Sequence, residues 1–178
     1  MPYAPLADAL ETERLNLRLW SERDAEGYRR LVLEREETRA EREGDEVDPG
    51  ALLSLDEARA EVTCARENAP ARGIHGLTLR RRGDDEFLGY CALVVGRATI
   101  DEPELAYELL RSAHGHGYAT EAAAAVVDAA RSTGRTRLWS TVRTWNTPSL
   151  RVLEKLGFRH DHSTTDDKGE IVWNVLDL

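Results

Sequence analysis

The sequence predicts one α/β domain built around a mixed sheet, and three observations lead to this prediction. Segments with the period-two alternation of strands and segments with helix caps are both spread along the whole chain. A chain of 178 residues normally forms one domain with a sizeable core. The sequence shows no internal repeat, low-complexity segment or linker that would divide it. We therefore expect residues 1–178 to fold as a single domain.

About seven strands are predicted. In Arg14–Trp20 apolar and polar residues alternate with the period of a half-buried strand. The turn sequence Gly83-Asp84-Asp85 joins two further strands as a hairpin. Another hairpin is expected at the end of the chain. The predicted strands comprise residues 14–20, 74–81, 87–95, 104–110, 137–143, 158–163 and 171–178.

Four helices are predicted from the signals at their ends. The first follows Ser21, with Asp24 in the acidic capping-box position, and should run to about Glu36. The second begins near Ser54, where Glu57 completes a Ser-x-x-Glu capping box, and should end at about Asn68, shortly before a proline. The third and fourth are expected at residues 118–132 and 146–157, and the fourth has proline near its first position. The third helix should bury Ala119, Ala122, Ala123, Val126, Val127 and Ala130.

Composition excludes several classes of function. The net charge of −9 argues against nonspecific nucleic-acid binding, which requires a basic face. No apolar run approaches the roughly 20 residues of a membrane span, and the N-terminus lacks the features of a signal peptide. Cys64 and Cys91 suit neither a disulfide framework nor a zinc site, so buried free thiols and a cytoplasmic location are expected. The two His-x-His pairs lack an obvious carboxylate or cysteine partner, and no metal is expected.

The most informative segment joins the strand at Glu104–Leu109 to a glycine-bearing turn and then to an alanine-rich helix. This order builds a pocket of backbone N–H groups that suits a phosphate. The turn lacks the Lys-Ser/Thr of a P-loop, and Thr120 poorly fills the third small position of a dinucleotide fingerprint. His114–Ala119 resembles a third pattern, the Gln/Arg-x-x-Gly-x-Gly/Ala pyrophosphate loop of acyl-CoA-dependent N-acetyltransferases. An ordinary strand-to-helix turn is a further alternative for this motif alone.

Three other segments extend the resemblance over about residues 11 to 178. Asn146–Phe158 closely resembles the Asn-x-x-Ser/Ala-x-x-Val/Leu-x-x-Lys-x-Gly-Phe segment of the GNAT superfamily of N-acetyltransferases. Thr12–Arg18, followed by Asp24-Ala25-Glu26, is similar to the opening of the RimJ/RimL-like group, and Glu104–Tyr107 is similar to its Glu-Ile-Gly-Tyr segment. Enzymes of this group acetylate N-terminal amines of ribosomal proteins, and relatives act on other amines. The chain is thereby identified as a member of the superfamily.

The resemblance implies a fold and a cofactor site. The fold would be a mixed, mostly antiparallel sheet of about seven strands, splayed at its centre, with about four helices. Acetyl-CoA would be the co-substrate, with its pantetheine arm in the gap between two splayed parallel strands and its pyrophosphate on the loop, and no metal would take part. His114 stands where the family has Gln or Arg. The implied cofactor-binding residues are Leu109, Leu110, Arg111, His114, Gly115, His116, Gly117, Tyr118, Ala119, Thr120, Asn146, Ser149 and Arg151.

Catalysis would use residues on both sides of this gap. The superfamily's general base is a strand glutamate, which predicts Glu104, with Glu108 on the same face as the alternative. Many members carry a tyrosine acid four residues before the Gly-Phe pair, but Leu153 stands there. Ser149 is therefore the predicted acid, with water as the alternative. The departures at Leu153 and His114 leave open a noncatalytic acyl-CoA-binding sensor on the same fold.

The acceptor is expected to be a primary amine. The loop at 41–49 and the terminal hairpin, with Asp161, Asp166, Asp167 and Glu170, are both acidic. A cleft lined by negative charge concentrates cations, which favours a basic protein N-terminus, a polyamine or an aminoglycoside-like amine. The alternative is that a protein of charge −9 simply has acidic loops. Neither nucleic acid nor membrane is expected as a partner. A homodimer and a longer acyl donor both stay open.

Overall fold

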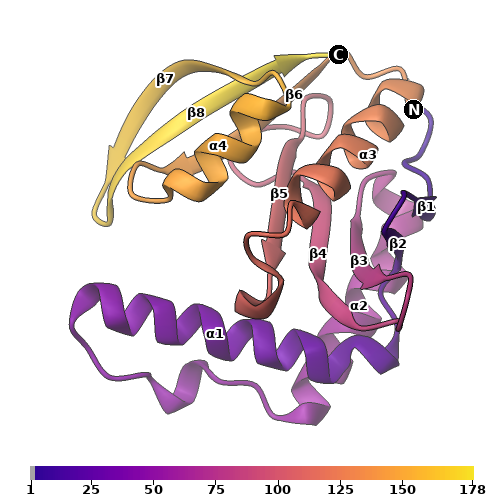
Figure 1. Cartoon of the computed structure of the whole chain (residues 1–178). Coiled ribbons are helices and arrows are strands. Elements are labelled where there is room, and N and C mark those ends of the chain that lie inside the picture. Colours follow the sequence, from indigo (N-terminus) through magenta and orange to yellow (C-terminus); the bar gives the residue numbers. More distant parts are fainter. Residues whose placement is uncertain (1–2) are drawn as a thin grey trace.

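The computed structural model describes residues 3–178 as an eight-stranded sheet with helices on both faces (Figure 1). The strand order is β1-β2-β3-β4-β5-β6-β8-β7, and every neighbouring pair is antiparallel except the parallel pair β5 and β6. The predicted mixed, mostly antiparallel sheet is confirmed. The strands are β1 (Ala9–Glu11), β2 (Leu15–Leu19), β3 (Gly76–Arg81), β4 (Phe87–Val94), β5 (Glu104–Leu109), β6 (Arg137–Arg143), β7 (Arg159–Asp166) and β8 (Gly169–Asp177).

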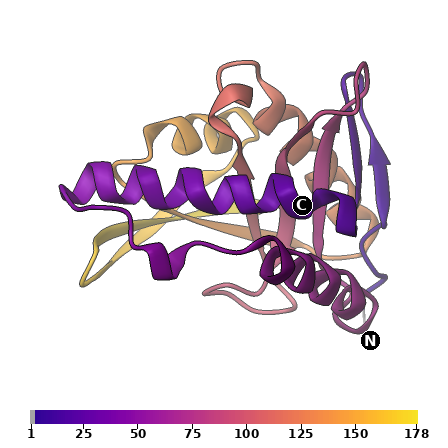
Figure 2. The same cartoon turned by 90° about the horizontal axis from the view of Figure 1, so that it is seen from below.

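Four α-helices cover the sheet, with α3 and α4 on one face and α1 and α2 on the other (Figure 2). Both predicted capping boxes form: the Ser21 N–H donates to Asp24 (2.9 Å) and the Ser54 N–H to Glu57 (2.8 Å). The helices are α1 (Ala25–Glu43), α2 (Leu55–Arg72), α3 (Tyr118–Ser132) and α4 (Thr147–Lys155), with short 3₁₀ turns η1 (Glu22–Asp24), η2 (Pro49–Ala51) and η3 (Arg111–Ala113).

The predicted ends of the first two helices were wrong, because both helices continue further. α1 extends past residue 36 to a left-handed cap at Gly44 (φ 73°), and Arg39 pairs along it with Glu36 (2.8 Å) and Glu43 (3.0 Å). α2 passes through Pro70 and ends at Gly73. A proline in the last turn removes only one backbone hydrogen bond, which is why the helix tolerates it.

The core lies on both faces of the sheet. The larger part packs α3 and α4 against the strands. The predicted α3 face is confirmed, with Ala122, Ala123 and Val126 each 0% exposed, except that Ala119 is only partly buried. Alanine side chains let this helix approach the sheet closely. A second cluster packs α1 and α2 on the opposite face around Trp20 and Phe87.

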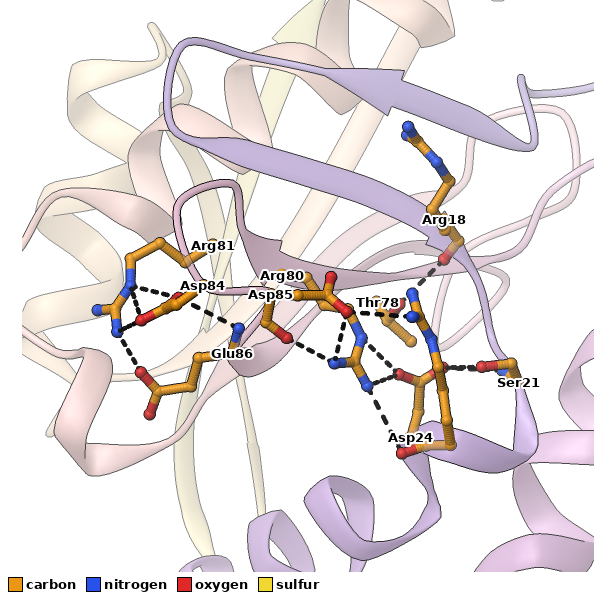
Figure 3. Close-up of polar contacts among 10 residues, drawn as sticks. Arg18, Ser21, Asp24, Thr78, Arg80, Arg81, Asp84, Asp85 and Glu86 are labelled. Atoms are coloured by element: carbon orange, nitrogen blue, oxygen red, sulfur yellow. Dashed lines mark hydrogen bonds and ion pairs between the residues drawn. The ribbon is translucent and has the colours of Figure 1, made fainter.

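A buried ion pair fastens η1 to β3 (Figure 3). The Asp24 carboxylate is 1% exposed and accepts from Arg80 Nε (3.0 Å) and Arg80 Nη2 (2.6 Å). The Ser21 hydroxyl donates to the same carboxylate (2.7 Å), and Arg80 Nη1 donates to the Asp85 carbonyl (2.6 Å). The neighbouring Arg81 points to the surface, where it pairs with Asp84 (2.6 Å).

The surface shows three further features. β7 is an edge strand whose residues from Arg159 to Thr165 are all exposed, with a register shift between His160 and His162. Cys91 is buried, but the prediction of a buried thiol was wrong for Cys64, which lies off the face of α2 that meets the core. Within residues 3–178, every helix is too short or too polar to cross a membrane.

Candidate active site

The centre of the sheet opens between β5 and β6. Their register comprises one pair, Glu104 with Trp139, whereas β4 and β5 are paired along six residues. Two bonds to backbone carbonyls also join this end of the strands: the Trp139 N–H donates to the Pro103 carbonyl (2.9 Å), and the Ser140 hydroxyl donates to the Leu105 carbonyl (2.9 Å). Beyond Leu105 the strands separate. This is the splay that the resemblance implied.

Backbone groups of β5 line this gap. The Leu110 N–H donates to the Leu88 carbonyl of β4 (2.9 Å). Because backbone groups alternate in direction along an antiparallel pair, Tyr107 and Leu109 direct theirs away from β4, into the gap. His114 Nε2 then donates to the Leu109 carbonyl (2.9 Å). The tautomer with a hydrogen on Nε2 follows from this contact, and the Leu109 N–H and both Tyr107 groups face the gap.

Two predicted cofactor residues lie elsewhere. The Leu110 side chain is 3% exposed and packs in the core cluster beneath α1, and its carbonyl accepts from the Ala113 N–H (2.8 Å). Arg111 faces α1: its N–H donates to the Glu34 carboxylate (2.7 Å), and its guanidinium donates to the Thr38 hydroxyl (2.9 Å). The structure therefore brings neither side chain into the gap.

The glycine-bearing turn opens α3 as predicted. Gly115 (φ 78°) and Gly117 (φ 80°) both adopt the left-handed conformation, which strains any other residue type. Gly117 is the N-cap of α3, and its carbonyl accepts the Glu121 N–H (3.1 Å). The N–H groups of the first helical turn, from Tyr118 to Thr120, therefore have no acceptor within the helix. A pyrophosphate is the kind of ligand that such groups bind.

The first turn of α4 flanks the gap on the α3 side of the sheet. Asn146 caps the helix through Oδ1, which accepts from the Ser149 N–H (3.3 Å), so its amide N–H₂ can donate elsewhere. The Ser149 carbonyl accepts from the Tyr107 hydroxyl (3.1 Å). Burial raises the pKa of Tyr107, so its phenol is protonated. Among residues 3–178, Arg151 and Lys155 have no ion-pair partner within 4.0 Å.

Glu104 lies at the closed end of the gap. Its side chain points to the α1 and α2 side by strand alternation, opposite to the side of Tyr107 and Ser149. The residue is 5% exposed, and its carboxylate accepts from the Thr141 hydroxyl (2.6 Å), the Thr141 N–H (3.3 Å) and the Arg97 N–H. These three donors hold the carboxylate in one orientation.

Glu108, the alternative base, is engaged by α1. Arg35 binds its carboxylate in a two-pronged ion pair, with bonds of 2.9 and 2.5 Å. This contact raises the pKa of Arg35, since hydrogen bonding to Glu108 favours the charged guanidinium. The neighbouring Tyr90 has a raised pKa because it is buried and lies beside the same carboxylate. Of the two glutamates, Glu108 is therefore the one committed to an arginine.

The acidic loops differ in how much free charge they offer. Asp166 of the terminal hairpin is bound by Arg143 (2.7 and 2.9 Å) and by Arg97 (3.1 Å). The Arg143 guanidinium holds the pKa of Asp166 far below its usual range. In the other loop, Asp48 accepts from the Gly50 N–H (2.9 Å) and caps η2. The hairpin is thus less acidic in effect than its sequence indicates.

One hollow lies outside the predicted site. A cavity of about 650 Å³ runs beside α2, with walls that include Cys64, Ile74, His75, Val94 and Val95. None of the predicted cofactor or catalytic residues lines it. Among residues 3–178, His75 Nδ1 has no hydrogen-bond partner, and burial lowers the pKa of this histidine, so the imidazole is neutral.

Sequence reasoning missed one set of residues at the phosphate loop. Thr12 and Arg14, in the turn between β1 and β2, contact Glu121 of α3 across more than a hundred positions of sequence. In the sequence, Thr12–Arg18 was recognised only as a segment that resembles the RimJ/RimL-like group, and no contact with α3 was predicted for it. The signal that could have found the contact is the acidic residue in the first turn of α3 beside a loop that should bind an anion.

The comparisons with known proteins agree with this geometry. Residues 14–159 match the acetyltransferase (GNAT) domain family. The chain belongs to this family, and it is an acetyl-CoA-dependent acetyltransferase. No curated protein sequence matches it significantly. The expectation drawn from residues 146–158 and 114–119 is thereby confirmed at the level of the family.

Solved structures share the fold over nearly the whole chain. An acetyltransferase from Agrobacterium tumefaciens is 25% identical, with a TM-score of 0.75 over 97% of this chain and 95% of that one. RimL, a ribosomal-protein α-N-acetyltransferase solved with coenzyme A, is 17% identical, with a TM-score of 0.73 over 99% and 98%. MccE, a microcin self-immunity acetyltransferase solved with acetyl-CoA and AMP, is 11% identical, with a TM-score of 0.77 over 94% of each chain.

Proposed function

We propose that this acetyltransferase transfers the acetyl group of acetyl-CoA to a primary amine in a ternary complex, in the cytoplasm. The observation that carries the proposal is the gap between β5 and β6. It has a helix N-terminus at its open end, Glu104 on one side of the sheet and Ser149 on the other. A free thiol at each of Cys64 and Cys91 is in keeping with a reducing compartment.

The chain's own groups fit the co-substrate. The N–H groups from Gly115 to Thr120 would hold the pyrophosphate at the α3 N-terminus, where the helix dipole also favours negative charge. The gap-facing backbone of Tyr107 and Leu109 would pair with the amides of the pantetheine arm, as a neighbouring strand would. The Asn146 amide N–H₂ supplies a further donor, and Arg151 and Lys155 supply charge for the remaining phosphates.

The proposed chemistry places the base and the acid on opposite sides of the sheet. A neutral amine attacks the thioester carbonyl, the C–S bond breaks, and the amine loses a proton as the amide forms. Glu104 accepts that proton, directly or through water, from the α1 and α2 side. Ser149 or water delivers a proton to the departing thiolate from the α4 side. Leu153, in the place of the family's usual tyrosine, is a buried hydrocarbon side chain with no acidic proton to give.

The proposed acceptor is a cationic amine, with a protein N-terminus or a small polyamine as the candidates. The support comes from the loop after α1, where Asp45 and Glu46 are exposed and have no ion-pair partner within residues 3–178. Asp166 contributes less, because two arginines bind it. Charge reversal at Asp45, Glu46 and Asp48 should lower kcat/KM for cationic amines; an unchanged value would remove the basis of this preference.

The test is a screen of amines and peptides with acetyl-CoA, in which acetylated products are read by mass. Glu104→Gln should lower kcat by about 10²- to 10⁴-fold, the range of a lost general base, with the affinity for coenzyme A retained. Glu102→Gln is the matched control, since Glu102 contacts Trp139 and Arg137 but faces no predicted reaction step. Full turnover by the Glu104→Gln variant would contradict its role. Coenzyme A binding without turnover of any amine would favour the noncatalytic sensor.

A further inference from the structure

The outer side of the phosphate loop is clamped by the turn between β1 and β2. The Glu121 carboxylate, in the first turn of α3, accepts from the Thr12 hydroxyl (2.5 Å), from the Arg14 N–H (2.9 Å) and from Arg14 Nε (2.7 Å). Arg14 Nη2 lies 2.6 Å from the same carboxylate. One carboxylate thus receives donors from two residues of a turn that is remote in sequence.

Arg14 also contacts the loop backbone. Its Nη1 donates to the His116 carbonyl (2.9 Å), and its guanidinium lies over the Tyr118 ring, 4.7 Å from the centroid. Arg14 Nη2 would lie in ordinary van der Waals contact, 3.5 Å, with a Cβ atom at Gly117. A carbonyl that is bound on the outside cannot turn into the cradle, where it would oppose an anion. The contact with Arg14 therefore holds the His116 carbonyl away from the inner side of the loop, where N–H groups would bind the anion.

Charge gives this contact a second consequence. Glu121 stands one helical turn from the N-terminus on which the pyrophosphate would bind, and its side chain is 18% exposed. A bare carboxylate there would repel the phosphates. The hydrogen bonds from Thr12 and Arg14 outweigh the effect of burial and lower the pKa of Glu121, so the group is anionic at neutral pH. Arg14 is the cation that balances it.

We infer that Arg14 is a positioning residue for acetyl-CoA: it neutralises Glu121 beside the pyrophosphate and holds the His116 carbonyl out of the cradle. This inference rests on the proposed cofactor site. It assigns a binding role to a residue of the β1–β2 turn that need not touch the co-substrate. It also explains how an acidic side chain can occupy the first turn of a helix whose N-terminus binds an anion.

The test measures the affinity for coenzyme A by calorimetry in four proteins. Arg14→Met should bind about tenfold more weakly than the wild type, the effect of an uncompensated charge about one helical turn from a phosphate. Glu121→Gln should bind at least as tightly as the wild type, because Arg14 then contributes an unopposed positive charge. The double variant restores a neutral pair and should recover the electrostatic part of the loss, while any remaining deficit measures the lost hold of Arg14 on the His116 carbonyl.

A purely structural clamp predicts a different pattern, in which each single variant weakens binding. Equal losses in Arg14→Met and Glu121→Gln would therefore overturn the electrostatic role. The deficit of Arg14→Met should also shrink between 0.05 and 0.5 M NaCl, roughly as screening predicts. Arg18→Met is the matched control, since Arg18 pairs with Glu11 in the same hairpin at 2.6 Å and should leave the affinity unchanged.

The failure of this inference can be told apart from failure of the proposed function. A wild-type protein that does not bind coenzyme A would refute the cofactor site itself. A wild-type protein that binds, with an Arg14→Met variant of equal affinity, would refute only the role of Arg14. Thermal unfolding of each variant without ligand shows whether the fold is retained, and Arg14→Lys, which keeps the charge, should retain more affinity than Arg14→Met.

Discussion

Replacing Arg80 by methionine should destabilise the protein far more than the same change at its neighbour. In the native state the Asp24 carboxylate receives four donors, two from Arg80 and two from Ser21. Arg80→Met removes two of these donors and the only cation that is paired with this carboxylate within residues 3–178. Asp24 is 1% exposed, so water cannot replace them. Leaving one buried partner of an ion pair unmatched typically costs about 3–5 kcal/mol.

Arg81→Met is the control that the chain itself supplies, as Figure 3 shows. Arg81 pairs with Asp84 at the surface, where their side chains are 37% and 52% exposed. Pairs of this kind contribute about 0–1 kcal/mol. The two substitutions are one position apart and identical in chemistry. They differ only in burial and in what the guanidinium holds.

Urea unfolding followed by circular dichroism measures the difference. The midpoint for Arg80→Met should fall by the equivalent of about 3–5 kcal/mol, and Tm by about 6–20 °C for a chain of this length. Asp24→Asn combined with Arg80→Met removes the buried, unpaired carboxylate and should recover part of the lost stability. Equal stabilities of Arg80→Met and Arg81→Met would refute the reasoning, because burial of the pair would then have no energetic consequence.

Two further predictions concern the loop and the terminal hairpin. Gly117→Ala should cost about 1–2 kcal/mol of stability, because its φ of 80° strains a side-chain-bearing residue, and should weaken coenzyme A binding; thermal shifts with and without coenzyme A measure both, and unchanged shifts would contradict it. The pKa of Asp166 is lower in the folded than in the unfolded protein. Its contact with Arg143 therefore stabilises the fold fully above the usual aspartate pKa of about 3.9, and this stabilisation is lost as pH falls below that value towards the folded-state pKa. The Tm of Asp166→Asn should therefore fall less than that of the wild type between pH 5 and pH 3, and parallel Tm curves would count against the contact.

Local signals predicted much of the fold. Ser21 with Asp24 and Ser54 with Glu57 marked two helix starts, because a capping box is completed within four residues. The period-two alternation of β2 and the helical spacing of the alanine face of α3 were also recognised in the sequence, because each element buries one side. The glycine-bearing turn before α3 was predicted for the same reason, because its glycines satisfy a local need for positive φ.

What the sequence did not reveal depends on distant contacts. β1 is three residues long, too short to show a period, and pairs with β2. The second half of α1 has charged residues without an apolar stripe, and part of its support comes from Arg111, which binds Glu34 and Thr38. The contact of Arg14 with Glu121 likewise joins segments whose proximity only the folded sheet creates. β1 and the second half of α1 leave no local pattern to read, and the acidic residue in the first turn of α3 indicates a counter-ion without identifying Arg14.

The edge of the sheet at β7 has a consequence for behaviour at high concentration. An edge strand of eight residues that is paired on one side only exposes, on its other side, backbone donors and acceptors that another chain could match. Here the exposed side chains are polar or charged throughout, and the register shift between His160 and His162 interrupts the regular spacing of those donors. Both features disfavour the addition of a further strand. The outer edge of the terminal hairpin can therefore remain uncovered without pairing with strands of other molecules.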